Sequence, residues 1–446
     1  MINFVIVMKR ILLTGATGVM GMQGLIQLSA YPERYEITLL ARDSAKNRNK
    51  LAPFMAKGVK VIWGDLLDKE AVKTAVCNAD IVLHVGGMVS PEADWHPEQT
   101  IRVNVVSMRN ILDAALPRKD EIKIVYIGSV SQYGSRYVPN HWGQCGDSLQ
   151  PAFYDAYAYS KVMAERLLME SEISHWVSLR QTGILHSGLL KKATDPITFH
   201  VPIHGVLEWV SAEDSGRLLE KVCRDEVPDS FWGNTYNIGG GADYRLTNHE
   251  FESMVLKATG CPPPEKVFET RWFATRNFHG FWFTDSDILE EILHFRSGKS
   301  FKEYLAIMKS ELPWYFKLAP LAPAFILKTF MKKVATTPKL GPLWWLKTNN
   351  DERIKAAWGS KEEQELIPDW AEMDFTRPSD VKPDVEQPSV ETIHDENTEI
   401  RTKCQECGTE YSLKFRTIKA GHGCPECLRR RLYMDLPSDI INMVNS

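Results

Sequence analysis

Tyr157 and Lys161 are the two residues whose types and spacing point most directly to chemistry. Residues four apart lie on one face of a helix, so the phenol and the ammonium point the same way. A free tyrosine titrates near a pKa of about 10, and a neighbouring ammonium favours the phenolate and lowers that pKa. Tyr157 is therefore a candidate acid/base for a substrate hydroxyl. Because the Tyr-x-x-x-Lys spacing is common by chance, the surrounding elements have to support this interpretation.

A glycine-rich turn near the start of the chain is a candidate pyrophosphate site. The apolar run from Ile11 to Leu13 leads into Thr14-Gly15-Ala16-Thr17-Gly18-Val19-Met20-Gly21, and an amphipathic segment follows. This is the order of a buried strand, a tight turn and a helix N-terminus, whose backbone N–H groups and positive dipole end suit a pyrophosphate. The spacing G-x-x-G-x-x-G differs from the usual G-x-G-x-x-G, so a turn without a ligand is the alternative.

The end of the next predicted strand indicates which dinucleotide is bound. Residues 36–41 are predicted as a strand, and Arg42 and Asp43 follow it where such folds meet the adenosine ribose. A guanidinium at this place suits a 2′-phosphate, whereas a carboxylate suits the 2′-hydroxyl of NAD. We therefore expect NAD(P) and favour NADP, while Asp43 keeps NAD open.

Small or polar residues follow each later predicted strand. They are Asp65 after the strand at 59–63, Gly86 after 81–85 and Ser129 after 123–127. A helix is predicted between the last two strands over 99–115, and it carries Asn104 inside its pattern. Strands that alternate with helices predict an α/β fold with a doubly wound parallel sheet, which binds ligands at the carboxyl ends of its strands.

Motifs spread over roughly residues 8–300 carry a family resemblance. They are TGATGVMG at 14–21, GDLLD at 64–68, IVLHVGG at 81–87, RVNVVSMRNILDAA at 102–115, YIGSVSQYG at 126–134, YAYSK at 157–161, SAEDSGRLLEKV at 211–222 and YNIGGG at 236–241. With these motifs the chain resembles the extended short-chain dehydrogenase/reductase family, whose members are often called NAD-dependent epimerases/dehydratases. The resemblance implies a Rossmann fold with a smaller substrate lobe.

The resemblance also implies a role for each matching residue. Ser129 would hydrogen-bond the reacting oxygen, and Tyr157 would be the acid/base. Lys161 would bind the nicotinamide ribose and tune Tyr157, while Asn104 would support this network. The implied cofactor-binding residues, besides Tyr157 and Lys161, are Gly15, Thr17, Gly18, Val19, Met20 and Gly21 for the pyrophosphate region, Arg42 for the adenosine ribose, Asp65 and Leu66 for the adenine, and Gly86 beside the ribose.

The sequence departs from the family pattern at two places, and these departures narrow the set of expected reactions. The chain has Gln181 after Arg180, where the family usually has a proline in a loop that borders nicotinamide and substrate. It also has Val130-Ser131-Gln132 where sugar 4,6-dehydratases carry an acidic pair. We therefore disfavour dehydration.

We predict an NAD(P)-dependent oxidoreductase that interconverts a hydroxyl and a ketone on a small or ring-bearing substrate. An NAD-dependent sugar-nucleotide epimerase is the alternative within the same class. A dinucleotide-sensing regulator that binds a partner through its C-terminal module is the alternative of another class, although the intact catalytic set argues against it.

Composition divides the rest of the chain. The dinucleotide domain is expected over 8–300, with its substrate lobe mainly at 183–215 and 265–300. Aromatic residues from Trp272 to Phe283 are either the core of this lobe or a pocket for a bulky substrate. Residues 301–370 are predicted to form a helical extension that packs on the lobe; a lid, a membrane surface and a partner protein are the other options. Residues 371–399 hold nine acidic and two basic residues and predict a disordered linker.

Four cysteines near the C-terminus have the spacing of a metal site. Cys404-x-x-Cys407 and Cys424-x-x-Cys427 lie sixteen residues apart. Four thiolates close a tetrahedral zinc site, and the short stretch between them has almost no core without metal. We predict a structural zinc ribbon over 400–431, with two disulfides as the alternative and His422 as a poorer ligand. The basic residues around it leave a protein partner, nucleic acid or the acidic linker open as binding targets.

Composition and the N-terminus set the cellular context. The 446 residues carry a net charge of -4 and a 44% hydrophobic share, which gives no global case for nucleic-acid or membrane binding. Lys9-Arg10 follow the first apolar run instead of preceding it, so no signal peptide is predicted and residues 1–7 are expected to be dispensable. We expect a cytoplasmic protein without a transmembrane segment that acts on a small molecule, and we leave a homodimer open.

Overall fold

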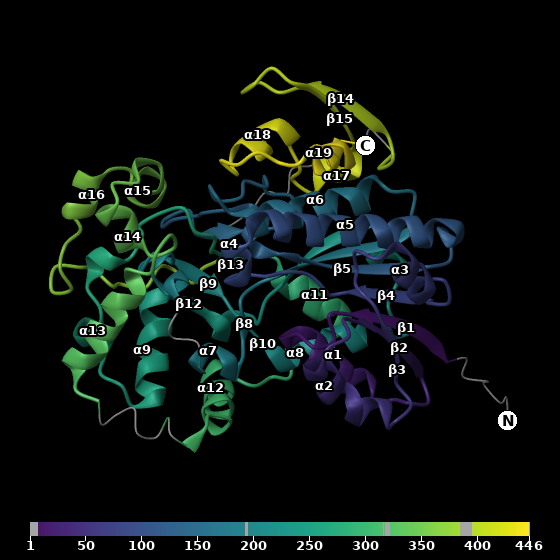
Figure 1. Ribbon diagram of the computed structural model, residues 1–446, viewed down its shortest axis with the longest axis horizontal. Coiled ribbons are helices and arrows are strands. Elements are labelled where there is room, and N and C mark those ends of the chain that lie inside the picture. Colours follow the sequence, from purple (N-terminus) through teal and green to yellow (C-terminus); the bar gives the residue numbers. More distant parts are fainter. Residues whose placement is uncertain (1–7, 192–194, 315, 317–321, 384–394, 446) are drawn as a thin grey trace.

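The computed structural model describes residues 8–191, 195–314, 316, 322–383 and 395–445. The expectations for residues 1–7 and for the middle of the acidic stretch at 384–394 lie outside the described residues. Within the described part of the chain, no helix is long and apolar enough to cross a membrane. Figure 1 shows a layered sheet domain, a lobe beside it, and a small C-terminal module that covers two of its helices.

A seven-stranded parallel sheet forms the centre of the first region, in the order β11-β7-β5-β4-β1-β2-β3. The chain starts in the middle of this sheet, winds outward to β3, and then returns to build the other half. The strands are β1 (Lys9–Thr14), β2 (Tyr35–Ala41), β3 (Lys60–Trp63), β4 (Ile81–His84), β5 (Lys123–Ser129), β7 (His175–Gln181) and β11 (Asn234–Ile238). The predicted doubly wound α/β fold is thereby confirmed.

Helices cover both faces of this sheet. One face packs against α3 (Lys69–Val76), α5 (Pro97–Ala115) and α6 (Ala156–Glu170). The other face packs against α1 (Val19–Leu28), α2 (Ala45–Met55), α8 (Ala212–Lys221) and α11 (Ser286–Leu293). The short helix α4 (Glu92–Trp95) leads from β4 into α5.

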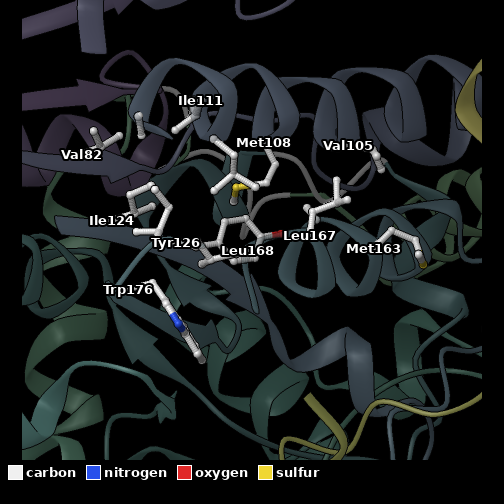
Figure 2. Packing of buried hydrophobic residues seen from close by; sticks show 14 of the residues in the cluster. Val82, Val105, Met108, Ile111, Ile124, Tyr126, Met163, Leu167, Leu168 and Trp176 are labelled. Carbon is white, nitrogen blue, oxygen red and sulfur yellow. The ribbon is translucent and has the colours of Figure 1, made fainter. Parts of the chain in front are cut away.

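The strands read as continuous apolar runs because both of their faces are buried. In β1, Leu12 points into the cluster with α5 and α6, while Ile11 and Leu13 point into the cluster with α1. Figure 2 shows the first cluster, in which Met108 of α5 and Leu168 of α6 lie over the sheet. This packing fixes the N-terminal turn of α6 beside the end of β5.

The lobe is built from short paired strands and helices. The strand pairs are β6 (Trp142–Gly143) with β13 (Trp282–Phe283), β8 (Ile184–Leu185) with β10 (Val210–Ser211), and β9 (Val206–Glu208) with β12 (Arg245–Thr247). Its helices are α7 (Ser187–Lys191), α9 (Asn248–Thr259), α10 (Pro264–Val267) and α12 (Phe301–Ser310). The structure thus differs from the expected lobe boundaries, because α8 and α11 belong to the sheet domain and α9 belongs to the lobe.

The aromatic stretch from Trp272 to Phe283 is divided between two cores. Trp272 and Phe273 are buried with Phe199 and Phe268, whereas Phe281 and Phe283 are buried beside the end of β5. Most of these rings therefore form the core of the lobe and its junction with the sheet domain, as the first of the two interpretations expected.

Four further helices follow the lobe in sequence. They are α13 (Ala324–Ala335), α14 (Pro342–Lys347), α15 (Asp351–Trp358) and α16 (Lys361–Glu365). Trp358 is 1% exposed and its indole N–H donates to the Phe273 carbonyl at 2.8 Å, so the extension packs on the lobe.

The first part of the acidic stretch differs from the expected disordered linker. Met373 and Phe375 pack on the lobe core, and the Phe375 ring stacks 3.9 Å from His249. Arg377 pairs with Glu250 at 2.6 Å, and Lys382 pairs with Asp287 at 2.9 Å. The acidic composition of this stretch gave no indication that Met373 and Phe375 would hold it against the lobe.

The C-terminal module is a hairpin followed by short helices. It contains β14 (Glu399–Lys403), β15 (Glu410–Lys414), α17 (Phe415–Lys419), α18 (Pro425–Arg430) and α19 (Ser438–Asn445). Figure 1 shows it, in yellow, lying across α5 and α6. Leu432, Leu436 and Ile440 of this module are buried in the same cluster as α5 and α6. The module is therefore a docked part of the sheet domain.

Candidate active site

The glycine turn brings backbone close to backbone at the carboxyl end of β1. Gly15 has φ +73°, and a Cβ there would lie 2.7 Å from the Gly86 backbone. A Cβ on Gly21 would lie 2.2 Å from the Gly15 carbonyl oxygen. Gly18 caps α1 without a side chain, so the first-turn N–H groups remain donors for an anion. Thr17, Val19 and Met20 complete this turn, and Met20 alone of the three is buried.

A buried hydrogen-bond chain fixes the neighbouring end of β4. The Gly86 N–H donates to Thr14 Oγ1 at 3.0 Å, and the same oxygen lies 3.0 Å from His84 Nδ1. His84 Nε2 lies 3.3 Å from Ser107 Oγ. Burial lowers the pKa of His84 to about 3. His84 is therefore a neutral, packed strand residue that holds the turn in place.

The end of β2 gathers positive side chains. Arg42 is exposed, and Asp43 is held by Arg48 through two contacts of 2.6 Å. Lys50, which the sequence argument did not single out, donates to the Thr17 carbonyl at 3.0 Å and so places its ammonium beside the glycine turn. The carboxylate of Asp43 is thus engaged by a cation at the place where NAD would need an acceptor.

Asp65 and Leu66 lie between β3 and α3. Asp65 Oδ1 accepts from the Leu67 N–H at 2.9 Å, and the Leu66 carbonyl accepts from Asn110 at 2.9 Å. A Cβ on Gly86 would lie 2.9 Å from the Leu66 side chain, so this loop and the end of β4 border one space.

Ser129 and Tyr157 meet where β5 ends and α6 begins. The Ser129 side chain lies close enough to Tyr157 to lower its pKa, and Ser131 Oγ donates to Ser129 Oγ at 2.9 Å. Asp155 caps α6 by accepting from the Ala158 N–H at 2.8 Å, which sets the first turn that carries Tyr157. One turn later, Lys161 Nζ donates to the Ile127 carbonyl at 2.8 Å and lies 5.9 Å from the centre of the Tyr157 ring.

Burial is the largest influence on the pKa values of both Tyr157 and Lys161. It raises the pKa of Tyr157 to about 12, although the hydrogen bond with Ser129 acts to lower it. Burial also lowers the pKa of Lys161 to about 8, although the Glu165 carboxylate acts to raise it. The structure therefore differs from the expected lowering of the Tyr157 pKa, because the Lys161 ammonium donates to a backbone carbonyl and not to the phenol.

Asn104 of α5 forms hydrogen bonds that hold the start of α6. Its Nδ2 donates to Ser160 Oγ at 2.8 Å and to the Met88 carbonyl at 3.0 Å, and its Oδ1 accepts from the Met88 N–H at 2.8 Å. The amide thus ties α5 to the segment after β4 and to the residue that precedes Lys161. Asn104 acts through these neighbours and does not contact Tyr157 in any of these bonds.

Gln181, which the sequence marked only as a departure from the family pattern, lies beside Ser129. Its Cα is the sheet partner of Ser129 in the β5–β7 register. The side chain is buried, its Nε2 donates to the Thr182 carbonyl, and its Oε1 has no hydrogen-bond partner among the described residues. The absent family proline was the available signal, because a proline there could not present such an acceptor.

A cavity of about 70 Å³ lies between the start of α6, the lobe and the extension. Asp94 and Asp155 line it from the sheet domain, His279 from the lobe, and Trp345 and Arg353 from the extension. Burial raises the pKa of Asp155 to about 7 and that of Asp94 to about 6. Residues from all three regions therefore enclose this space, which Asp155 borders two residues before Tyr157.

A fully buried ion pair lies behind α6, the helix that carries Tyr157. Glu165 and Arg180 are both 0% exposed, and Arg180 Nη2 lies 2.6 Å from Glu165 Oε1. Arg180 Nη1 also donates to the Tyr133 hydroxyl at 2.7 Å, just beyond Ser129 in sequence. Although burial opposes ionisation, the Arg180 charge holds the pKa of Glu165 well below its usual range. The pair thus joins α6 to the segment that carries Ser129.

The C-terminal module completes this pair. His422 Nε2 lies 2.9 Å from Glu165 Oε1, and Arg180 Nη2 donates to the Ala420 carbonyl at 2.8 Å. His422 is therefore engaged with the sheet domain, and the interpretation of it as a poorer metal ligand is wrong. Lys414 and Arg416 donate to the last carbonyls of α6, where a cation suits the helix dipole.

The four cysteines form one cluster between the hairpin and α18. Their sulfur atoms all lie within 4.8 Å of one another. Cys404 Sγ is 3.5 Å from Cys427 Sγ, and Cys407 Sγ is 3.6 Å from Cys424 Sγ. All four are free thiols, so the two-disulfide alternative is wrong. With Zn–S bonds of about 2.3 Å, sulfurs of a tetrahedral site lie about 3.8 Å apart, and this donor set fits such an ion.

Comparisons with known proteins cover the dinucleotide domain. Residues 11–180 match the model of the NAD dependent epimerase/dehydratase family. A crystal structure of dTDP-glucose 4,6-dehydratase from Bacillus anthracis, in complex with NAD, superposes with a TM-score of 0.55 at 16% identity. That superposition covers 69% of this chain and 97% of the other. It shows the same fold.

Two curated relatives share less of their length. The chain is 31% identical over 107 residues to UDP-N-acetylglucosamine 4,6-dehydratase (inverting) of Campylobacter jejuni, covering 24% of this chain and 32% of that protein. It is 26% identical over 219 residues to the NAD-dependent glucose-6-phosphate dehydrogenase of Haloferax volcanii, covering 47% of this chain and 78% of that protein. The chain thus spans about a third of the length of the first of these.

Proposed function

We propose that the protein is an NAD(P)-dependent oxidoreductase that interconverts a hydroxyl and a ketone, because residues 11–180 match the model of the NAD dependent epimerase/dehydratase family. The observation that supports this proposal is the placement of Tyr157 and Lys161 one helical turn apart at the start of α6, beside Ser129 at the end of β5. The strand that ends at Ser129 pairs with β4, and Gly86, two residues after β4, lies against Gly15 of the glycine turn. The proposed acid/base groups and the proposed pyrophosphate site therefore lie together at the carboxyl ends of neighbouring strands.

The proposed cofactor lies along this edge. The turn from Gly15 to Gly21 would hold its pyrophosphate, Asp65 and Leu66 its adenine, and Gly86 would allow its ribose to approach. We favour NADP because Arg42 is exposed at the end of β2, Lys50 bonds the glycine turn, and Arg48 engages the Asp43 carboxylate, so that this end of β2 offers cations to a 2′-phosphate. Exchange of Arg42 for alanine is expected to weaken NADPH binding by about tenfold and to leave NADH binding nearly unchanged, as measured by fluorescence titration.

The proton steps follow from the side chains at the end of β5. A nicotinamide cofactor held by this chain would supply the hydride for the carbonyl carbon in the reducing direction. Ser129 donates a hydrogen bond to the carbonyl oxygen, and Tyr157 gives its proton to that oxygen as negative charge develops there. Lys161 contributes the positive charge that stabilises the resulting phenolate. Oxidation of the alcohol runs through the same groups in reverse.

Replacement of one oxygen atom tests the proposal. Tyr157→Phe is expected to lower kcat by at least about a hundredfold while the dissociation constant for NADPH stays within twofold. Tyr159→Phe, on the same helix, is the matched control and should keep wild-type turnover. Near-wild-type turnover of Tyr157→Phe on a true substrate would show that another residue transfers the proton.

A sugar-nucleotide epimerase is the second candidate, because the matched family includes epimerases. Such an enzyme needs its nucleotide oxidised and tightly held through turnover. Denaturation of the purified protein should then release NAD, whereas the favoured reaction predicts exchangeable NADP. Tight dinucleotide binding without turnover of any carbonyl compound or sugar nucleotide would instead favour the regulator.

The cysteine cluster is proposed to hold a structural zinc ion. Cys404, Cys407, Cys424 and Cys427 would be its thiolate ligands, and their donor set and spacing support a closed site. Because the basic residues Lys414 and Arg416 dock the module on α6, we propose that it serves this protein's own fold. Elemental analysis of the full chain should give one zinc per molecule, and Cys404→Ser with Cys407→Ser should give none.

A further inference from the structure

The helix α13 has apolar side chains on opposite faces. Its inner side packs on the lobe core through Met331, Val334 and Ala335. On the outside, Phe325 is 71% exposed, Ile326 49% and Phe330 45%. Large apolar side chains gathered on an exposed helix face mark a surface that lacks a cover in the described structure.

The sequence around this helix has one sign of charge. From Leu312 to Asn350 there are six lysines and no acidic residue, although the whole chain has a net charge of -4. Lys332, Lys333 and Lys339 are exposed, and Lys328 pairs with Glu269 of the lobe at 3.2 Å. The uncovered apolar face is therefore bordered by cations.

Apolar and basic side chains occupy different ends of α13. At 100° per residue, Phe325, Ile326 and Lys333 lie on the outward side, with Phe330 at its edge. Phe325 and Ile326 stand in the first turn of the helix, Phe330 near its middle, and the exposed Lys332 and Lys333 in the last turn. The helix can therefore place its rings among acyl chains while its lysines reach lipid phosphates.

We propose that the outer face of α13 docks this protein on an anionic lipid surface. The helix lies in the headgroup region with Phe325, Ile326 and Phe330 inserted, and Lys332 and Lys333 contact the phosphates. A second copy of this chain fits less well, because two such faces would bring their lysines together. The charge of the segment thus selects lipid over self-association.

Vesicle sedimentation with the full-length protein tests this surface. The protein should bind vesicles of 70% phosphatidylcholine and 30% phosphatidylglycerol at low salt, and binding should fall as salt is added. Phe325→Ser with Phe330→Ser should weaken binding at least about tenfold, because both side chains lose their apolar burial. Lys332→Glu with Lys333→Glu should abolish binding to these vesicles.

Two matched variants keep the test specific. Leu366→Ser with Val381→Ser removes apolar side chains that are 80% and 77% exposed elsewhere, and should bind as wild type. Lys57→Glu with Lys69→Glu makes the same charge change in the dinucleotide domain and should also bind. Equal binding to pure phosphatidylcholine, unchanged binding of the α13 variants, or a dimer that Phe325→Ser with Phe330→Ser dissociates would overturn the proposal.

Discussion

Lys161 has the most consequential charge at the candidate active site. It is 4% exposed, and its ammonium is held between the Ile127 carbonyl and the ring of Tyr126. Burial favours its neutral form, whereas its proposed role in stabilising the Tyr157 phenolate needs the charged form. The residue therefore combines a structural bond with a charge that titrates close to neutral pH.

The pH dependence of reduction follows from this titration. Because burial lowers the pKa of Lys161 to about 8, the ammonium is present below that pH and lost above it. Tyr157, with a pKa raised to about 12, stays protonated over the same range. We expect kcat/KM for carbonyl reduction to be level below pH 8 and to fall above it. A profile that stays level to pH 10 would contradict this assignment.

Gln181 should affect substrate or cofactor binding more than stability. Its Oε1 is a buried acceptor with no partner among the described residues, next to Ser129 in the sheet. Gln181→Ala removes that acceptor and is expected to raise KM for substrate or cofactor about tenfold. Its free energy of unfolding should change by less than about 1 kcal/mol, as measured in urea. Gln181→Glu, which keeps an acceptor oxygen, serves as the comparison.

Sequence reasoning reached most candidate residues because strand ends and motifs are local. Ser129, Tyr157 and Lys161 lie within two short motifs, and the sheet brings those motifs together as the motif order predicted. Lys50 and the Glu165–Arg180 pair were missed, since their contacts depend on side-chain paths across the fold. The expectation that the pKa of Tyr157 is lowered was wrong for the same reason.

At the scale of elements, α6 is held at both ends. Asp155 caps its start, and Lys414 and Arg416 bond its last carbonyls. Between these two ends, the Glu165 carboxylate contacts both Arg180 and His422, and all three side chains are buried. The module thus constrains the same helix that carries Tyr157 and Lys161.

Removal of the His422 contact should destabilise the protein. His422→Ala leaves Glu165 with one partner fewer in a buried site, which is expected to lower the free energy of unfolding by about 1–3 kcal/mol. His422→Gln keeps a side-chain N–H donor and should recover part of this loss. Urea unfolding measures both. Lys419→Ala, which removes only a surface pair with Glu396, is the control.

Metal removal should loosen the whole module. A chelator is expected to lower the melting temperature of the wild-type protein, because the hairpin and α18 are joined mainly through the four cysteines. The same chelator should not change the melting temperature of Cys404→Ser with Cys407→Ser. Unchanged melting of the wild-type protein after its metal has been removed would refute a structural role for the ion.

The elements of the sheet domain were predictable and those of the lobe were not. Strands such as β1 and β4 are continuous apolar runs between turns, which single-sequence patterns reveal. The lobe uses strands of two or three residues, such as β6 and β8, which are too short for any periodicity. Its boundaries depend on which face α8, α9 and α11 bury, and that is a tertiary property.

At the scale of the whole molecule, one apolar core contains residues from near both ends of the described chain. Ile440 of α19 is 0% exposed and belongs to the cluster that contains Leu12 of β1 and Leu168 of α6. Ile440→Asp buries a carboxylate there and is expected to cost about 3 kcal/mol or more in urea unfolding. Asn442→Asp makes an acidic change at an exposed position of the same helix and should be neutral. Equal stability of the two variants would show that α19 does not hold the core closed.

The contact between His422 and Glu165 joins residues that are 257 positions apart. During synthesis α6 therefore leaves the ribosome long before the segment that covers it. Until the cysteines emerge and bind the proposed zinc ion, α5 and α6 present an apolar surface and an incompletely paired Glu165 to the cell. The yield of native protein should thus depend on zinc supply during the synthesis of the module, with chaperones protecting that surface in the interval.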